Sequence, residues 1–454
     1  MEDITMRKIF QYIMLAVVTI VMASCTSDIE ETTATTGKNN VQLVVGEFPA
    51  FGDSQTRAIG TPDEGKTSWA EGDELLLEID NTSYGRHNAT FTYNGKSWEL
   101  TSGELVYLEG DPAYISHVYY APNYKWSNTS LMLKKGKVAG TDELIEGKAI
   151  ITGNGETITV SFAEATRKYS RLRIATLPNE QITVDTEYFT PAGSSDMEQN
   201  GNYTLTSDEK GNAYLYGTFE NNSEVTVKYR EAALTTYTFS QATENAKSYA
   251  LDATVISANS AEEIKSAIEQ KVADGKTTIR LNLAPNAGTN EFMAIREAIK
   301  GAAPNDLGTI ELTIIGVETI PEEAFYKMLQ LKSVRMSDVK EIKKYAFKEC
   351  QYLTVVEAPS LNKLYSGAFK KCDQLSKLTF GPINYADERN WPIFEYITPN
   401  IDLILSDYQK EMIETDSYLY TANNDRDYAG SDEHNSKNFL GREFKSITCR
   451  YPVE

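Results

Sequence analysis

The sequence predicts a mainly β, multidomain protein in which two β-sandwich domains are followed by a short α/β solenoid with a cap at each end. Three observations predict this class. The chain has 454 residues, which is too long for one ordinary core. Apolar residues recur with a period near 2 from Val41 to Val255, between turns rich in Gly, Asn and Asp. One sequence motif then occurs three times between Pro321 and Phe380, as expected for a solenoid.

The first 25 residues are typical of a signal peptide. Arg7 and Lys8 precede an apolar run over 9–23, which is shorter than the roughly 20 residues of a spanning helix. The run ends in Met-Ala-Ser-Cys at Cys25, which resembles the lipobox of bacterial lipoproteins. That resemblance implies that Cys25 is acylated and becomes the first mature residue. The alternative is an ordinary secreted chain with an incidental cysteine, and translation can start at Met1 or Met6.

Residues 26–40 are expected to form a flexible tether rich in Thr, Gly and Asn. Its acidic residues Asp28, Glu30 and Glu31 resemble the export signal of Bacteroidetes lipoproteins that reach the outer face of the outer membrane. The resemblance implies a lipid-anchored, surface-exposed protein of the outer membrane. A solvated run of charges is the alternative interpretation.

We expect two β-sandwich domains at 41–165 and 166–257, joined near Ala165. Ten strands are predicted: 41–48, 74–79, 89–93, 115–120, 157–162, 171–175, 213–219, 224–229, 235–240 and 249–256.

Several short motifs in this region resemble the fimbrillin family of Bacteroidetes surface lipoproteins. They are Thr-Arg-Ala at 56–58, Ser-Trp-Ala-Glu-Gly-Asp-Glu at 68–74, Tyr-Tyr-Ala-Pro at 119–122, Asp-Glu-Leu at 142–144, Ser-Phe-Ala-Glu-Ala at 161–165 and Arg-Leu-Arg-Ile at 171–174. The resemblance covers about 41–255. It departs from the family in the strand after Gly-Asp-Glu, which has Leu-Leu-Leu-Glu-Ile at 75–79 instead of an aromatic pattern.

In polymerising fimbrillins an arginine-specific protease removes the first strand, and a strand of a neighbouring subunit fills the groove by β-strand addition. Arg57 matches the cleaved arginine, so the resemblance implies a mature surface form that starts at Ala58. An exposed loop arginine that no protease cuts is the alternative.

A helical cap is predicted at 258–306. Ser260 and Glu263 have the spacing of a capping box, followed by apolar residues at helical spacing. A strand at 276–283 and a second helix at 292–300 complete the cap, which shields the open end of the solenoid.

The solenoid is predicted at 307–405. Phe325, Phe347 and Phe369 are 22 residues apart, and we expect their rings to form a buried column. A leading half repeat is predicted at Leu312, and an insertion of three residues places Phe394 in the phenylalanine position. The ladder is thus expected to have about five parallel strands.

The phrase Ala-Phe-Lys-Glu-Cys, with a leucine six residues after the phenylalanine, resembles the BspA-type leucine-rich repeat. That family is common in bacterial surface proteins that bind host matrix or other cells. Residues 406–454 are expected to form the C-terminal cap, because Gly-Arg-Glu-Phe-Lys-Ser-Ile at 441–447 resembles the closing segment of that family.

Strand residues that point away from the core should form two exposed columns. The first is Glu311, Ser333, Val355, Lys377 and Asp402, and the second is Thr313, Arg335, Glu357, Thr379 and Ile404. The mixed charges at Arg335, Glu357 and Lys377 favour a protein partner on this face.

The composition argues against nucleic-acid binding and against catalysis. The net charge is 44 − 65 = −21, which repels a phosphate backbone. His87, His117 and His434 have no neighbouring nucleophile or metal-ligand spacing, so we predict no enzyme activity, no cofactor and no metal. Cys350 and Cys372 share one repeat position and are predicted to be buried thiols, with a disulfide as the alternative.

The leading hypothesis is therefore a non-enzymatic surface lipoprotein. It acts as an adhesin or as a tip or accessory subunit of a fimbria, and it binds fimbrial, host or microbial surface proteins through its leucine-rich repeats. The alternatives are a glycan-binding lipoprotein of the outer membrane and a polymerising pilin subunit. In each case the membrane is contacted only through the lipid anchor.

Overall fold

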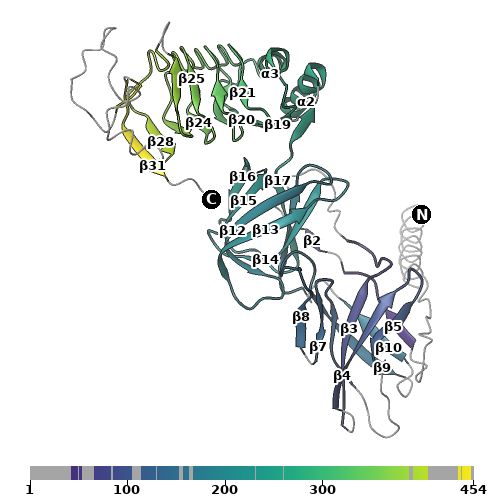
Figure 1. Cartoon of the computed structure of the whole chain (residues 1–454). Coiled ribbons are helices and arrows are strands. Elements are labelled where there is room, and N and C mark those ends of the chain that lie inside the picture. The colour runs from purple at the N-terminus through teal and green to yellow at the C-terminus, as the bar shows by residue number, and fades with distance from the viewer. Residues whose placement is uncertain are drawn as a thin grey trace, which may run out of the picture.

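The structure is a computed structural model that describes residues 42–49, 51–53, 66–82, 85–104, 114–128, 130–152, 157–162, 167–230, 232–258, 260–387, 392–406, 438–440 and 442–450. The described chain is mainly β, with several sheets and two helices. Figure 1 shows three groups of elements in sequence: a first β module, a second β module and a repeat region. The coarse prediction of a β-rich multidomain protein is confirmed.

The first β module is a seven-stranded sheet in the order β1-β10-β9-β6-β3-β4-β5. Its strands are β1 (Gln42–Val45), β3 (Glu74–Asn81), β4 (Gly85–Tyr93), β5 (Trp98–Gly103), β6 (Tyr114–Tyr120), β9 (Ile145–Thr152) and β10 (Thr157–Ser161). Leu75, Leu77 and Phe91 are fully buried on one side of the sheet. The hairpin of β7 (Tyr124–Ser127) and β8 (Ser130–Leu133) brings Tyr124 against Leu76 on the other side. This second contact explains why β3 is buried along most of its length instead of alternating.

The second β module is an eight-stranded sheet in the order β16-β15-β12-β14-β11-β17-β2, with β13 paired to β12. Its strands are β2 (Gly52–Asp53), β11 (Ser170–Ala175), β12 (Gln181–Pro191), β13 (Glu198–Thr206), β14 (Asn212–Phe219), β15 (Glu224–Tyr229), β16 (Ala232–Thr238) and β17 (Lys247–Asp252). Aromatic rings fill its core: the ring centroid of Phe219 lies 4.5 Å from that of Phe189, which is tilted against it, and 4.7 Å from that of Phe239, which is stacked on it.

Each of the ten predicted strand regions contains a strand, and seven further strands of the two β modules were missed. These are β2, β5, β7, β8, β9, β12 and β13. The long hairpin β12–β13 was missed because Thr, Glu, Asn and Gln interrupt its apolar alternation. In each β module the strands that surround the apolar core belong to one hydrogen-bonded sheet and not to two separate sheets. The two-sheet sandwich therefore stays a prediction. The predicted join near Ala165 lies outside the described residues.

The repeat region contains two parallel sheets. The larger has the order β18-β19-β20-β22-β24-β26-β28-β31, and the smaller has the order β21-β23-β25-β27. The bounds of the larger are Ile256–Ala258, Thr278–Leu283, Ile310–Ile315, Leu331–Arg335, Val355–Ala358, Lys377–Phe380, Asp402–Ser406 and Ser446–Arg450. Those of the smaller are Thr319–Ile320, Glu341–Ile342, Lys363–Tyr365 and Tyr385–Asp387. A two-stranded pair, β29 (Asn438–Phe439) and β30 (Arg442–Glu443), lies near the C-terminus.

The predicted phenylalanine column is confirmed. Phe325, Phe347, Phe369 and Phe394 are fully buried, and successive ring centroids are 5.1, 5.4 and 5.7 Å apart. The three-residue insertion is also confirmed, because Phe394 takes its place in the column. The prediction of about five strands in the ladder at 307–405 is confirmed, because β20, β22, β24, β26 and β28 follow one another there, and β18, β19 and β31 extend the sheet beyond this range.

The caps close the column at both ends. At the start, Phe292 of α3 (Thr289–Ala302) meets Phe325 edge to face at 5.6 Å. At the end, Phe444 meets Phe394 in the same way at 5.5 Å. The other cap helix, α2 (Ala261–Ala273), begins at the predicted N-cap, where the Ser260 hydroxyl accepts the backbone N–H of Glu263.

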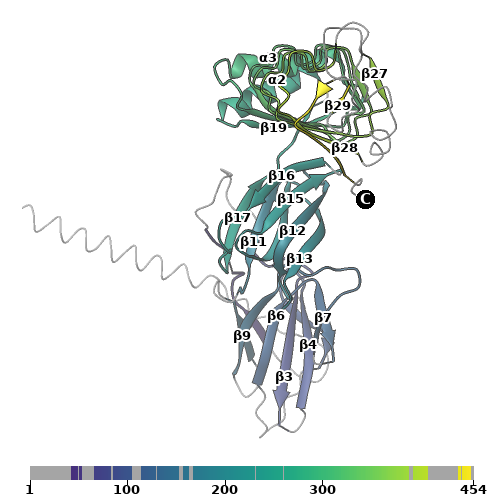
Figure 2. The same ribbon diagram turned by 90° about the vertical axis from the view of Figure 1, so that its left-hand side faces the viewer.

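A buried arginine lies where the repeat region meets the second β module. Arg280 of β19 donates from Nε to the backbone oxygen of Leu234 at 2.6 Å, and its guanidinium lies 3.8 Å from Asp252. Ile315 of β20 packs into the apolar core of the second module. Figures 1 and 2 show the larger sheet on the side of the repeat region that faces β16, with α2 and α3 on the far side.

Two predicted surface positions are buried, which corrects the second exposed column. Thr313 is 4% exposed because its strand lies at this junction, two residues from Ile315. Ile404 is 9% exposed at the opposite end of the ladder, where β31 closes the sheet.

Candidate functional site

The outward side chains of β22, β24 and β26 form the strand face. This name covers Ser333, Arg335, Val355, Glu357, Lys377 and Thr379. The structure pairs these residues in the register that the repeat predicts, from Glu311 through to Asp402.

The strand face brings Arg335, Glu357 and Lys377 together. Arg335 donates from Nε to Glu357 Oε2 at 2.9 Å, and Lys377 Nζ lies 3.9 Å from Glu357 Oε1. Their side chains are 42%, 29% and 45% exposed. An exposed ion pair contributes only about 0 to 1 kcal/mol, so this triad has little effect on folding and is available to a partner.

Further ion pairs flank the strand face. Lys332 pairs with Glu311 at 2.8 Å, and Lys445 pairs with Asp402 at 2.9 Å. Hydrogen bonds from Ser446 and then Lys445 hold the pKa of Asp402 below its usual range. Because the strands already pair with one another through their backbones, recognition on this face has to occur through side chains.

A second surface lies on the turns and the smaller sheet, and we call it the lysine–tyrosine face. Its lysines lie over tyrosine rings: Lys343 over Tyr365 at 4.4 Å, Lys344 over Tyr345 at 4.8 Å and Lys327 over Tyr326 at 5.1 Å. Lys348 lies over two rings, 5.0 Å from that of Tyr326 and 4.8 Å from that of Tyr345. Lys370 lies 5.7 Å from the ring of Tyr396.

Three glutamates are interspersed with these lysines. Glu341 binds Lys343 and also Lys363, the latter at 2.7 Å, and hydrogen bonds from these lysines lower the pKa of Glu341. Glu349 lies 3.6 Å from Lys327, and Glu395 lies 2.6 Å from Lys370.

The described residues of 42–53 form an N-terminal segment that reaches both β modules. β1 pairs in parallel with β10 at the edge of the first sheet, and β2 pairs in parallel with β17 at the edge of the second. One short stretch of chain therefore supplies an edge strand to each module.

Two phenylalanines hold this segment in place. Phe48 packs edge to face against Trp69 at 5.0 Å. The ring of Phe51 lies 3.9 Å from the guanidinium carbon of Arg167 and 4.3 Å from that of Arg171. A cation–π contact of this kind contributes about 2 kcal/mol or more when it is desolvated.

The arginine beneath Phe51 belongs to a buried network. Arg167 is fully buried and makes two hydrogen bonds of 3.1 Å to the carboxylate of Glu143. Tyr169 donates its hydroxyl to the same carboxylate at 2.6 Å, and burial raises the pKa of Tyr169 well above its ordinary value. The network joins the β9 side of the first module to β11 of the second.

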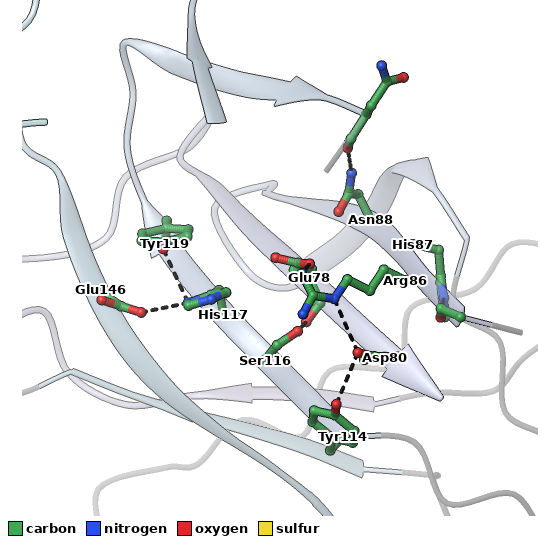
Figure 3. A network of polar contacts seen from close by, with 12 residues as sticks. Glu78, Asp80, Arg86, His87, Asn88, Tyr114, Ser116, His117, Tyr119 and Glu146 are labelled. Atoms are coloured by element: carbon green, nitrogen blue, oxygen red, sulfur yellow. Dashed lines mark hydrogen bonds and ion pairs between the residues drawn. The ribbon is translucent and has the colours of Figure 1, made fainter. Parts of the chain in front are cut away.

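Figure 3 shows a polar network on the first β module around His117. Nδ1 of His117 lies 2.7 Å from Glu146 Oε1 and 3.2 Å from the hydroxyl of Tyr119. Ser116 donates instead to the backbone oxygen of Glu78, so it is not placed as a nucleophile for the histidine. Nearby, Asp80 accepts from Arg86 at 3.3 Å and from Tyr114 at 3.0 Å.

Several predicted sites lie outside the described residues. They are the lipidation site Cys25, the processing site Arg57 and Ala58, and His434. In the part of the chain that the structure describes, no helix is long and apolar enough to cross a bilayer.

The parallel ladders and the phenylalanine column agree with a comparison against known families. Residues 307–413 match the family described as BspA type leucine rich repeat region, in 6 copies. The repeat region is of the BspA type. A comparison with curated proteins gave no match. The predicted BspA-type resemblance is confirmed for this region, and the fimbrillin resemblance of the β modules stays a prediction.

Sequence reasoning missed the lysine–tyrosine face of the BspA-type repeats. Its signal lies in the residues around the repeat phenylalanines, where Lys and Tyr stand at Tyr326-Lys327 and Lys370-Lys371 and at Lys343-Lys344-Tyr345 and Lys348 on either side of Phe347. The backbone is left-handed at several of these positions, including Lys327 and Tyr345, with φ of 58° and 57°. Gly367 has the same conformation at the position equivalent to Tyr345, and such turns direct these side chains away from the core.

Proposed function

We propose that this protein is a non-enzymatic surface lipoprotein that acts as an adhesin or fimbria-associated subunit. In this proposal its BspA-type repeats form a leucine-rich solenoid that binds protein partners. The main support is the exposed triad of Arg335, Glu357 and Lys377 on the central strands of the parallel ladder. Mixed charges on a regular surface suit a protein partner, because complementary charges fix the register of association.

Support for the remaining parts of the proposal comes from the sequence and from the histidine network. The lipobox-like sequence ending at Cys25 implies the anchor, and the acidic residues after it imply the outer face of the outer membrane. His117 pairs with Glu146 on the surface of a sheet, and Ser116 is turned away from it, which favours a function without catalysis.

A double charge reversal tests the strand face. We expect Arg335→Glu with Lys377→Glu to reduce binding of the full chain to immobilised extracellular-matrix glycoproteins and to intact bacterial cells by tenfold or more. The matched control is Lys332→Glu with Lys445→Glu, which makes the same charge change at the flanking pairs and should leave binding within about threefold. Unchanged binding of the first variant would exclude this face.

One observation favours a polymerising pilin subunit as a second candidate. Both strands of the N-terminal segment, β1 and β2, are edge strands, and both precede Arg57. Cleavage after Arg57 would release them together and uncover the backbone hydrogen-bonding groups of β10 and β17 for a strand of another subunit.

The mature N-terminus distinguishes the two candidates. An acylated Cys25 in protein isolated from cells supports an anchored adhesin. An N-terminus at Ala58 in protein that resists dissociation as high-mass ladders supports the pilin subunit. Replacing Arg57 with Gln should abolish the ladders without changing the acylation of Cys25.

A further inference from the structure

The charge of the lysine–tyrosine face is opposite to that of the chain as a whole. The charged residues named on this face are six lysines (327, 343, 344, 348, 363 and 370) and three glutamates (341, 349 and 395), a net charge of +3, whereas the complete chain carries −21. In both views α3 lies on the side of the repeats that is turned away from the β modules, and Phe292 of α3 continues the column beneath these turns. The basic surface is thus separated from most of the acidic charge.

The tyrosine rings of this face hold its lysine side chains in place. Lys348 lies over both Tyr326 and Tyr345, which come from successive repeats, and Lys344 lies over Tyr345. These contacts hold the ammonium groups in place before any ligand arrives, which reduces the entropy lost on binding. The tyrosine hydroxyls at the rims of the rings can donate and accept hydrogen bonds.

The repeat sets the spacing of the face. The phenylalanine rings beneath it are 5.1 to 5.7 Å apart, so equivalent positions on successive repeats follow at a similar distance. This spacing is close to the length of one sugar ring in a linear polysaccharide. Each of the three repeats carries at least one of these lysines, at different positions of the repeat, so a chain of sugars that carries about one sulfate or carboxylate on each ring would meet lysines on successive repeats.

We propose that the lysine–tyrosine face is a binding site for an anionic polysaccharide, bearing sulfate or uronate groups. The lysines bind the anionic groups and the tyrosine hydroxyls bind sugar hydroxyls. A nucleic-acid duplex fits less well, because it carries one negative charge per roughly 1.7 Å and is stiff, so most of its charge lies beyond these few repeats and meets no lysine. The site lies on another face from the partner-binding triad and does not depend on the function proposed for that triad.

Immobilised heparin, a sulfated polysaccharide, is the probe for this proposal. We expect the full chain to bind heparin at 150 mM NaCl and not to bind neutral dextran. The triple variant Lys327→Gln, Lys344→Gln and Lys348→Gln should lose at least tenfold in affinity and elute at lower salt. The matched control is Lys332→Gln, Lys377→Gln and Lys445→Gln, which removes the same charge from the strand side and should stay within about twofold of the wild type.

A second pair of variants tests the tyrosine contacts. Tyr345→Phe keeps the ring beneath two lysines and removes one hydroxyl, so it should weaken heparin binding by about two- to threefold. Tyr345→Leu removes the ring and should weaken binding more than Tyr345→Phe does, while thermal unfolding shows that the repeats remain folded.

Three results would overturn the proposal. They are failure of the full chain to bind heparin, an equal loss of affinity in both triple variants, and binding of duplex DNA or anionic vesicles as tightly as heparin. Loss of adhesion in the Arg335 and Lys377 reversal variant with heparin binding retained would show that the two faces act separately.

Discussion

At the scale of the residue, the two repeat cysteines are kept as thiols by their burial in the core. Cys350 and Cys372 are fully buried, and each Sγ donates to a backbone oxygen of the preceding repeat at 3.0 Å. The two are free thiols, which confirms the prediction from their shared repeat position and excludes the alternative disulfide.

Burial should make these thiols inert. It raises the pKa of Cys350 to about 12 and that of Cys372 well above its ordinary value, so both are neutral at pH 7 to 9 and the reactive thiolate is scarce. We expect iodoacetamide to leave both unmodified in the native protein and to alkylate both in guanidinium chloride, as mapped by peptide mass spectrometry. Cys449 is partly exposed and is the internal control. Alkylation of Cys350 at the rate of Cys449 in native protein would contradict this prediction.

At the scale of the element, the N-terminal segment depends on Phe51 for its attachment to the second module. β2 has only two residues, so its backbone pairing alone is weak. The ring of Phe51 lies between Arg167 and Arg171 and fastens the segment to the second module.

Replacing Phe51 with Ala should therefore loosen the segment. We expect a loss of roughly 2 to 4 kcal/mol, from two cation–π contacts and the buried ring area. Hydrogen exchange should become faster in β2 and in β17, its partner, while the repeat region is unaffected. Tyr114→Ala, which removes an aromatic ring that is 57% exposed, is the control and should have little effect. Unchanged protection of β17 in Phe51→Ala would show that backbone pairing alone holds the segment.

The elements differ in how far the sequence predicts them. The repeats were predicted to single-residue register, because their period fixes which side chains stack. The attachment of 42–53 to two modules was not predicted, since β2 pairs with β17 nearly 200 residues later and local pattern carries no information on such pairing. The lysine–tyrosine face was missed because it depends on the packing of side chains from neighbouring repeats. Thr313 was assigned to the surface because the junction with Ile315 is not visible in a repeat pattern.

At the scale of the whole molecule, the junction between the second module and the repeats sets the direction in which both repeat faces point. Its polar contacts come from Arg280, Leu234 and Asp252. Burial raises the pKa of Asp252, but hydrogen bonds from Thr254 and the charges of Lys271 and Arg280 outweigh this effect, and the pKa is lowered overall.

The junction should therefore weaken in acid. A carboxylate with a lowered pKa in the folded state contributes stability above its unfolded pKa of about 3.9, and that stability is lost as the pH falls through the folded value. We expect Asp252→Asn to lower the melting temperature at pH 7 and to flatten its decline between pH 5 and pH 3. Asp373→Asn, in an exposed turn of the repeats, is the control. An unchanged pH profile in Asp252→Asn would show that Asp252 does not couple the junction to pH.

The phenylalanine column also allows the number of repeats to change during evolution. Each cap meets the column through a phenylalanine placed edge to face, Phe292 at one end and Phe444 at the other. If one whole 22-residue repeat were gained or lost, Phe292 and Phe444 would each still pack against a repeat phenylalanine in the same register. Both faces would then lengthen or shorten by one strand spacing, roughly 4.8 Å, with no compensating change in the core. Unequal recombination between the repeats would thus change the area of both faces in steps of one repeat.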